Sequence, residues 1–171
     1  LADQNIPRLV DPHLAGGALL DLGIYPISFA EMILGNPLSI NSSAVMTNKG
    51  VDAQTSMIFT YENGAQSVLT TTMIEQTPCR AVVAGLHGWL EIDRTFYNPA
   101  SMRVILNDGS VTQYPSTYTG HGLREQAESF KQLVQSGKLE SEILSWQDTI
   151  DIMKTMDAVR EQIGLKYPFE G

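Results

Sequence analysis

Three pairs of alternating polar and apolar segments between residues 39 and about 115 constrain the fold more than any other feature. Asn63-Gly64 separates the first pair, and this dipeptide is the strongest short-range signal for a two-residue β-hairpin. Similar turns are expected near residues 87–88 and 108–109. Because successive hairpins build antiparallel sheets, the sequence predicts a large, open, mainly antiparallel sheet with one face buried.

Helical patterns lie on both sides of the strand region. Residues 16–35 carry apolar side chains at helical spacing. Pro26 lies inside this pattern and has no N–H to donate, so we expect it to kink the helix. Two more helices are expected near the C-terminus, one ending at Gly137 and one running from a capping box at Ser145 to Gly164. The pattern favours an α+β domain with the helices on one face of the sheet.

Length and charge narrow the class of protein. The 171 residues fit one domain with a real core, so residues 1–171 are assigned to a single domain. The 11 basic and 19 acidic residues give a net charge of −8, which disfavours nucleic acid as a partner. The apolar stretches are too short to cross a bilayer, so no membrane is expected. Cys79 is the only cysteine, and we expect a cytoplasmic location.

Motifs for metal and nucleotide binding are absent from the sequence. Gly16-Gly17 is followed next by Gly23, so no G-x-G-x-x-G fingerprint is present, and no strand precedes these glycines. The three histidines lack the spacing of metal ligands, so no metal site is expected; they are His13, His87 and His121. His121 lies between two glycines, which either allow a backbone to approach a ligand or form a helix cap.

Asp21 and Tyr25 are the strongest candidates for chemistry. They are four residues apart, so they project from one helical face, one turn apart. A phenol can exchange a proton with a reacting carbonyl or hydroxyl, and a carboxylate can orient that phenol or hold a substrate hydroxyl. On spacing alone, an ordinary surface pair or a local hydrogen bond is the favoured interpretation.

Four segments, taken in order, resemble the C-terminal domain of the Gfo/Idh/MocA oxidoreductase family, and in particular its dimeric dihydrodiol dehydrogenase-like branch. The most specific is AGGALLDLGIYPISFAEMILG, residues 15–35. The others are residues 50–73, 85–99 and 139–171, so the resemblance covers nearly the whole chain. It implies a large open sheet with helices that closes a substrate pocket over a nicotinamide.

The resemblance also implies roles for particular residues. Family members use an Asp and, four residues later, a His or Tyr in the first helix of this domain, and these positions are Asp21 and Tyr25 here. We therefore expect both to be catalytic. The family's loops approach the cleft at further positions, which we expect to contribute to substrate binding; these are Arg8, Phe96, Tyr97, Tyr118 and His121.

The reaction implied by the family is hydride transfer between a nicotinamide and a sugar, a sugar derivative or a small cyclic diol. The cofactor, NAD or NADP, is bound by an N-terminal Rossmann domain with a catalytic lysine, and neither is visible in this sequence. We therefore expect the chain to be the substrate-side half of a two-domain enzyme, inactive alone and paired as a homo-oligomer through the sheet. The alternatives are a non-catalytic dimerisation module and a small-ligand-binding module.

Overall fold

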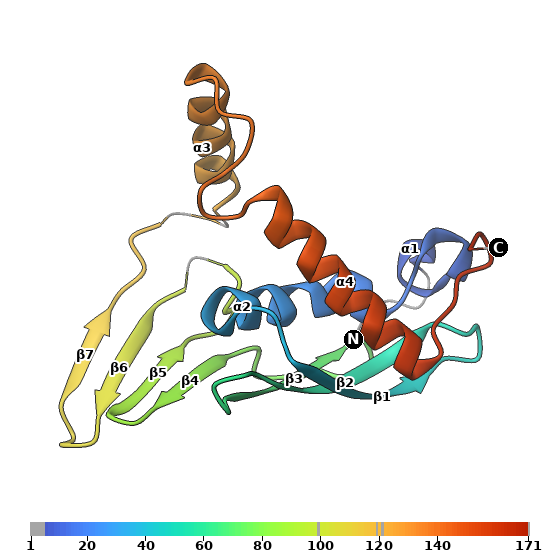
Figure 1. Cartoon of the computed structure of the whole chain (residues 1–171), viewed down its shortest axis with the longest axis horizontal. Helices are drawn as coiled ribbons and strands as arrows, with labels where there is room; N and C mark the ends of the chain where they lie inside the picture. Colours follow the sequence, from blue (N-terminus) through green and yellow to red (C-terminus); the bar gives the residue numbers. More distant parts are fainter. Residues whose placement is uncertain (1–5, 99, 119, 121, 171) are drawn as a thin grey trace. The chain divides into compact units, whose positions relative to one another are not determined.

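The computed structural model describes residues 6–98, 100–118, 120 and 122–170, and the chain divides into two compact units. The first unit comprises Leu1–Gln76 together with Glu142–Gly171, and the second comprises Thr77–Ser141. The elements of the first unit are α1 (Pro7–Val10), η1 (Pro12–Leu14), η2 (Leu19–Gly23), α2 (Ile24–Leu34), β1 (Ser39–Met46), β2 (Asp52–Thr60), β3 (Gln66–Thr72) and α4 (Trp146–Ile163) (Figure 1). Those of the second are β4 (Ala81–Gly85), β5 (Gly88–Ile92), β6 (Met102–Leu106), β7 (Val111–Tyr114) and α3 (Leu123–Gln135).

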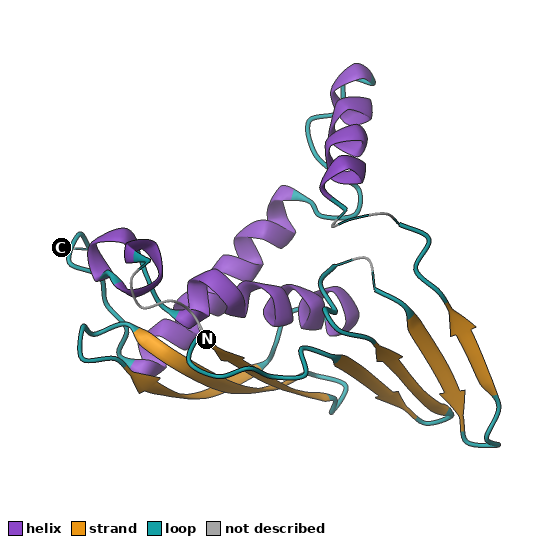
Figure 2. Ribbon diagram, turned by 180° about the vertical axis from the view of Figure 1, so that it is seen from behind, coloured by secondary structure: helices purple, strands orange, loops and turns teal. Residues whose placement is uncertain are grey.

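The first unit is a three-stranded antiparallel sheet, in the order β1-β2-β3, with helices on one face. Helices η2, α2 and α4 lie on the same side of these strands in both views (Figure 1 and Figure 2). Strand β2 alternates accordingly, since Met57 and Phe59 are buried while Ile58 between them is exposed. The core lies between this sheet face and the helices and contains Leu19, Ile27, Val51, Met57, Phe59, Met156, Val159 and Leu165.

The helix that follows Ala18 begins with one π-helical turn, η2, and continues as α2. The sequence predicts a kink at Pro26, and the structure shows a wider, π-helical turn directly before α2. Pro26 lacks the N–H that would bond to the carbonyl of Leu22, and insertion of a π turn is one way for a helix to absorb such a mismatch. Asp21 lies within this turn.

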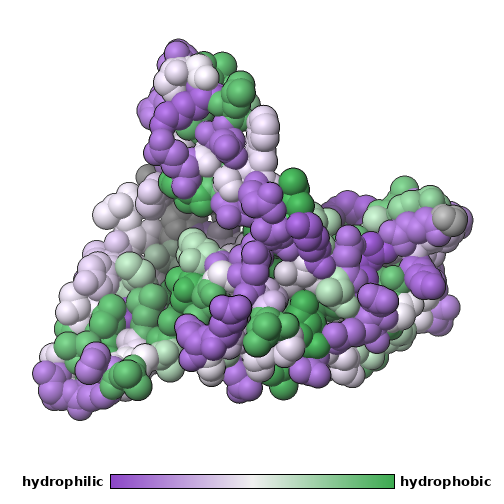
Figure 3. Space-filling view, viewed as in Figure 1, coloured by the Kyte–Doolittle hydropathy of each residue, from purple (hydrophilic) through white to green (hydrophobic). Residues whose placement is uncertain are grey.

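The second unit is a four-stranded antiparallel meander, β4-β5-β6-β7, followed by α3. Its two tight connections lie where the sequence predicts them, between β4 and β5 and between β6 and β7. Gly88 has a φ of +152°, and a Cβ atom there would lie 2.1 Å from the carbonyl oxygen of Ile105, so only glycine fits. Helix α3 is amphipathic, with hydrophobic and hydrophilic side chains both at its surface (Figure 3).

The α+β class and the antiparallel pairing are confirmed, and the strands divide between two sheets where the sequence predicts one. The break falls between β3 and β4, at residues 73–80. Pro78 cannot donate to a ladder, and Cys79 has a φ of +52°, outside the extended region of a strand. These residues interrupt the pairing that alternation of hydrophobicity alone would continue.

The expectation that every apolar stretch is too short to cross a bilayer is wrong for one segment, because Pro12–Leu34 is long and apolar enough by length and composition, with a mean hydropathy of 1.4. Such a stretch is also typical of a core helix in a folded domain. Leu19, Ile27 and Ala30 of this stretch are buried, and the first two belong to the core between the helices and the sheet. The packing of the first unit therefore accounts for part of the apolar composition of this segment, of which 33% is buried.

Glu31 of α2 provides a pH-dependent contribution to stability. Burial, together with the nearby carboxylates of Asp151 and Asp148, raises the pKa of Glu31 from 4.5 to about 7. One of its oxygens, Oε2, is buried without a hydrogen-bond partner among the described residues. Because the pKa is higher in the folded state, the stability that Glu31 contributes is fully present below pH 4.5 and is lost as the pH rises through 7.

We predict that Glu31→Gln stabilises the protein at pH 8 by about 1 kcal/mol, a value that already allows for the screening of this partly exposed side chain by solvent. At pH 4.5 the change should have almost no effect. Glutamine resembles the protonated acid, so it removes only the buried charge. Urea unfolding at the two pH values measures the difference. Glu161→Gln, an exposed change on α4, is the control and should have a small effect that is equal at both pH values. An equal gain at both pH values for Glu31→Gln would contradict the prediction.

Candidate functional site

Asp21 is paired with Arg8, one of the residues predicted to bind substrate. Arg8 Nη1 donates to Asp21 Oδ1 over 2.5 Å, and the pair joins α1 to the π turn η2. Both side chains remain partly exposed to solvent. Among the described residues, nothing donates to Asp21 Oδ2, so that oxygen can accept a hydrogen bond from a bound hydroxyl group. The structure thus brings together two of the residues that the sequence predicts for the site.

Tyr25 is the second residue of α2 and follows Asp21 along the same continuous helical segment. Its side chain is 40% exposed, which is high for a tyrosine beside a hydrophobic core. Ile27, two residues later, is buried in that core, so the helix presents Tyr25 on its outer side. The arrangement offers a phenol and an ion-paired carboxylate on one accessible segment.

The backbone that leads into this helix is held by three buried side chains from distant parts of the chain. We call residues 16–19 the 16–19 turn. Asp52 Oδ2 of β2 accepts the N–H of Leu19 at 2.8 Å. Thr71 Oγ1 of β3 donates to the carbonyl of Ala18 at 3.2 Å. The Tyr167 hydroxyl, in the C-terminal segment, donates to the carbonyl of Gly16 at 2.9 Å.

Asp52 is a fully buried carboxylate at the start of β2. Its Oδ2 also accepts from Thr55 Oγ1 at 2.7 Å, while Oδ1 has no hydrogen-bond partner among the described residues. Burial raises the pKa of Asp52, and the hydrogen bonds from Thr55 and Leu19 act in the opposite direction. The carboxylate lies at the N-terminal end of η2, where the helix dipole favours negative charge.

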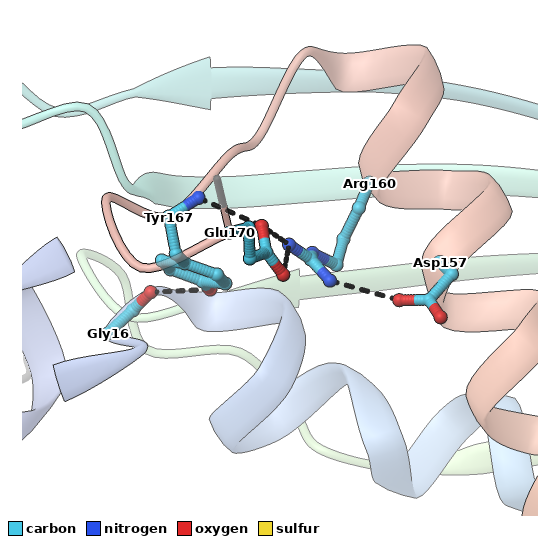
Figure 4. A network of polar contacts seen from close by, with 5 residues as sticks. All are labelled: Gly16, Asp157, Arg160, Tyr167 and Glu170. Atoms are coloured by element: carbon cyan, nitrogen blue, oxygen red, sulfur yellow. Dashed lines mark hydrogen bonds and ion pairs between the residues drawn. The ribbon is translucent and has the colours of Figure 1, made fainter. Parts of the chain in front are cut away.

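Tyr167 is held in turn by an ion-pair network at the end of α4 (Figure 4). Arg160 donates to both carboxylate oxygens of Glu170 at 2.5 Å and to Asp157 at 3.0 Å. Its guanidinium lies 4.9 Å from the ring centre of Tyr167, within the range of a cation–π interaction. Burial and the charge of Asp52 raise the pKa of Tyr167 to about 12, so the phenol stays protonated and keeps its bond to Gly16.

The remaining predicted pocket residues belong to the second unit. Phe96 and Tyr97 form an edge-to-face pair with ring centres 5.3 Å apart. Tyr118 is exposed, and His121 lies outside the described residues. The candidates therefore form one group on the first unit, Arg8, Asp21 and Tyr25, and a second group on the 77–141 unit.

Sequence reasoning did not find Asp52, Thr71 or Tyr167. The available signal was an acidic residue inside the otherwise buried start of a strand, at Val51-Asp52-Ala53. Nothing in the spacing shows that its partner is the N–H of Leu19, 33 positions earlier. Within the part of the chain that is described, no group of three or more His, Cys, Asp or Glu side chains could hold a metal ion.

The family described as GFO/IDH/MocA C-terminal domain matches residues 2–91, more than half of the chain. The chain belongs to this family. The resemblance carried by residues 15–35 and 50–73 is thereby confirmed. The matched region contains Asp21, Tyr25 and Asp52, while the C-terminal segment with Tyr167 lies beyond it.

Curated relatives of the chain are dehydrogenases. Trans-1,2-dihydrobenzene-1,2-diol dehydrogenase from Xenopus tropicalis is 32% identical over 173 residues, which cover 96% of this chain and 52% of that protein. The scyllo-inositol 2-dehydrogenase (NADP(+)) of Bacillus subtilis (strain 168) is 29% identical, with 92% of this chain and 47% of that protein covered. The chain thus spans about half the length of the curated relatives it matches.

Solved structures share the fold. The 3-ketoreductase KijD10 from Actinomadura kijaniata, in complex with NADP and TDP-benzene, has a TM-score of 0.80 at 24% identity, over 95% of this chain and 50% of that one. The aldose-aldose oxidoreductase from Caulobacter crescentus, complexed with glycerol, has a TM-score of 0.79 at 22% identity, over 95% and 50%. At these identities the likeness shows the fold alone.

The 16–19 turn should tolerate no side chain at Gly17. This residue has a φ of +125°, and a Cβ atom there would lie 2.3 Å from Asp52 Oδ1. We predict that Gly17→Ala lowers the free energy of unfolding by about 3 kcal/mol, because backbone strain and a collision with buried Asp52 add together. Urea denaturation measures the change.

Gly50→Ala is the matched control for Gly17→Ala. Gly50 also has a positive φ, +85°, but nothing lies within 4 Å of the added Cβ. It therefore reports the backbone strain alone, about 1 kcal/mol. Equal losses for the two variants would show that the close approach of Asp52 to Gly17 has no energetic consequence.

Proposed function

We propose that this chain is the substrate-side half of an NAD(P)-dependent oxidoreductase that acts on a sugar, a sugar derivative or a small cyclic diol. The observation that carries the proposal is the accessible helical segment on which Asp21, held by Arg8, precedes Tyr25. Family membership supports the reaction class, and the names of the relatives include dehydrogenases of a diol and of an inositol.

We propose that the dinucleotide binds mainly to a half of the enzyme that this chain does not contain. The chain has no glycine-rich turn that follows a strand and opens a helix, which is the backbone feature that cradles a pyrophosphate. When bound, the nicotinamide accepts or donates the hydride at its C4 atom. The chain alone is therefore expected to bind neither NAD nor NADP strongly and to be inactive by itself.

Tyr25 is proposed to move the proton. In the oxidative direction the substrate C–H bond breaks and its electron pair leaves with the hydride. The hydroxyl O–H bond breaks, its proton passes to the oxygen of Tyr25 in the deprotonated form, and a C=O bond forms. In the reductive direction the Tyr25 hydroxyl donates that proton to the carbonyl oxygen as the hydride arrives. Tyr25 is 40% exposed, so part of the residue is in contact with solvent.

Asp21 is proposed to hold a second substrate hydroxyl. Arg8 fixes the orientation of the carboxylate through a charge-assisted bond to Oδ1, and this bond also sets the direction of Oδ2. A vicinal diol or a sugar presents two neighbouring hydroxyls, one for Asp21 and one for Tyr25. A contribution of Phe96, Tyr97, Tyr118 and His121 to substrate binding stays a prediction from the family resemblance.

We predict that Tyr25→Phe in the full-length enzyme lowers kcat by roughly 10²–10⁴-fold and leaves cofactor affinity and the melting temperature almost unchanged. The change removes one hydroxyl from an exposed position and no packing atoms. Steady-state kinetics with a thermal melt measure both quantities. Tyr114→Phe is the control, because Tyr114 has a similar exposure of 46% on β7. Turnover within about twofold of the parent would return Tyr25 to a structural role and favour a non-catalytic module.

A homo-oligomer paired through the sheet is part of the proposal. Ile58 and Val68 are directly opposite each other on the face of β2 and β3 that the helices leave uncovered, and they are 44% and 76% exposed. Their neighbours on this face are small and polar, such as Ser56 and Thr70. An exposed sheet face that carries apolar side chains can pair with a second copy of itself. We also propose a cytoplasmic location, supported by the lone thiol of Cys79.

We predict that Ile58→Lys weakens the self-association of the full-length enzyme by tenfold or more, equivalent to about 1.4 kcal/mol, because two charges would face each other across the symmetric interface. Sedimentation velocity over a concentration series measures the change. Met32→Lys, an equally drastic change at an exposed position on α2, should leave the association intact. A strict monomer in the parent protein would rule out this part of the proposal.

A further inference from the structure

Buried polar side chains are few in this protein, and they are concentrated beneath the 16–19 turn. Four polar or charged residues are buried among those described, and three of them, Asp52, Thr55 and Thr71, lie in β2 and β3 on the side of the helices. Thr55 and Thr71 are directly opposite each other in the register of the two strands. Thr55 also donates to Asp52, so the three residues form one polar cluster of neighbours beside the hydrophobic core.

The cluster contacts both ends of the π turn that carries Asp21. At the beginning of the turn, Asp52 accepts the Leu19 N–H, and Thr71 donates to the carbonyl of Ala18. At its end, the methyl group of Thr71 would lie 3.4 Å from a Cβ atom at Gly23, so η2 lies next to β3 at this point as well. The cluster therefore determines where η2 sits on the sheet.

Stability alone does not explain a carboxylate at this position. Removing a carboxylate from water is costly, and a buried polar atom without a partner, such as Asp52 Oδ1, adds to that cost. A well-packed apolar side chain in the same place would commonly stabilise a fold as much or more. What an apolar side chain cannot provide is an acceptor for the N–H of Leu19, which fixes the first residue of the turn.

We propose that Asp52 is a positioning residue: through Leu19 it fixes the π turn on the sheet and so sets the location of Asp21 and Tyr25 relative to a bound substrate. This inference rests on the proposed function of Asp21 and Tyr25. Asp52 itself does not touch the substrate, because its side chain is fully buried under the 16–19 turn. A displacement of about 1 Å in the reacting groups can lower the rate by about 10²-fold.

The test compares Asp52→Ala, Asp52→Asn and Val159→Ala in the full-length enzyme, at a temperature where all three are folded. Asp52→Ala removes the acceptor, and we expect kcat to fall by about 10–100-fold with unchanged cofactor affinity. Asp52→Asn keeps an oxygen that can accept the Leu19 N–H, and we expect it to restore kcat to within about fivefold of the parent. Val159→Ala, a core change on α4, destabilises the same unit and should keep kcat near the parent value.

Hydrogen exchange provides a readout that does not depend on activity. In Asp52→Ala, the amides of residues 19–25 should exchange at least about tenfold faster than in the parent, because the turn has lost its anchor. In Val159→Ala these amides should not be selectively affected. If Asp52→Ala does not fold, Thr71→Val tests the positioning role in its place. It removes the bond to Ala18 with almost no change in volume, and it should lower kcat by about 3–10-fold.

The outcomes separate the positioning role from the proposed function. If Tyr25→Phe loses activity while Asp52→Ala keeps the turnover of the Val159→Ala control, the positioning role is wrong and the proposed function stands. If neither Tyr25→Phe nor Asp52→Ala changes turnover, the proposed function itself is wrong. The positioning role of Asp52 is established by three results together: turnover is lost in Asp52→Ala, it recovers in Asp52→Asn, and the amides of residues 19–25 exchange faster in Asp52→Ala.

Discussion

The hydrogen bond from the Leu19 N–H to the buried Asp52 carboxylate is the interaction on which the arrangement of the candidate site depends. It connects the beginning of the helix that bears Asp21 and Tyr25 to the central strand of the first unit. Hydrophobic packing of Leu19 and Ile27 holds this helix against the sheet, but apolar contacts are not directional. A directed bond at the first residue of the turn supplies the orientation that packing leaves open.

Local signals in the sequence were sufficient to predict most of the regular structure. The Asn63-Gly64 hairpin is present, and Ser145 caps α4 through the reciprocal bonds with Asp148 expected of a capping box. Both features depend on residues within a few positions of each other. The π turn and the separation of the strands into two sheets were not predicted, because each depends on how a helix or strand meets distant parts of the chain.

The candidate site shows the same division between local and distant information. Asp21 and Tyr25 were found through resemblance to a family, since their spacing alone favoured an ordinary surface pair. Their support was not found, because Asp52, Thr71 and Tyr167 lie 33, 53 and 151 positions from the backbone groups they bind. Hydrophobic periodicity identifies faces that are buried, and it contains no information about which buried polar group meets which backbone atom.

The bond between Tyr167 and Gly16 has a consequence for how the protein is made. It joins residues 151 positions apart, and Tyr167 is itself held by Arg160 and Glu170 at the end of α4. During synthesis the sheet of the first unit can form as soon as β3 has left the ribosome, whereas the 16–19 turn lacks one of its three supports until Tyr167 emerges. The sheet of the first unit would therefore form early, and the hydrogen bonds that hold the 16–19 turn beneath Asp21 would be completed among the last folding steps.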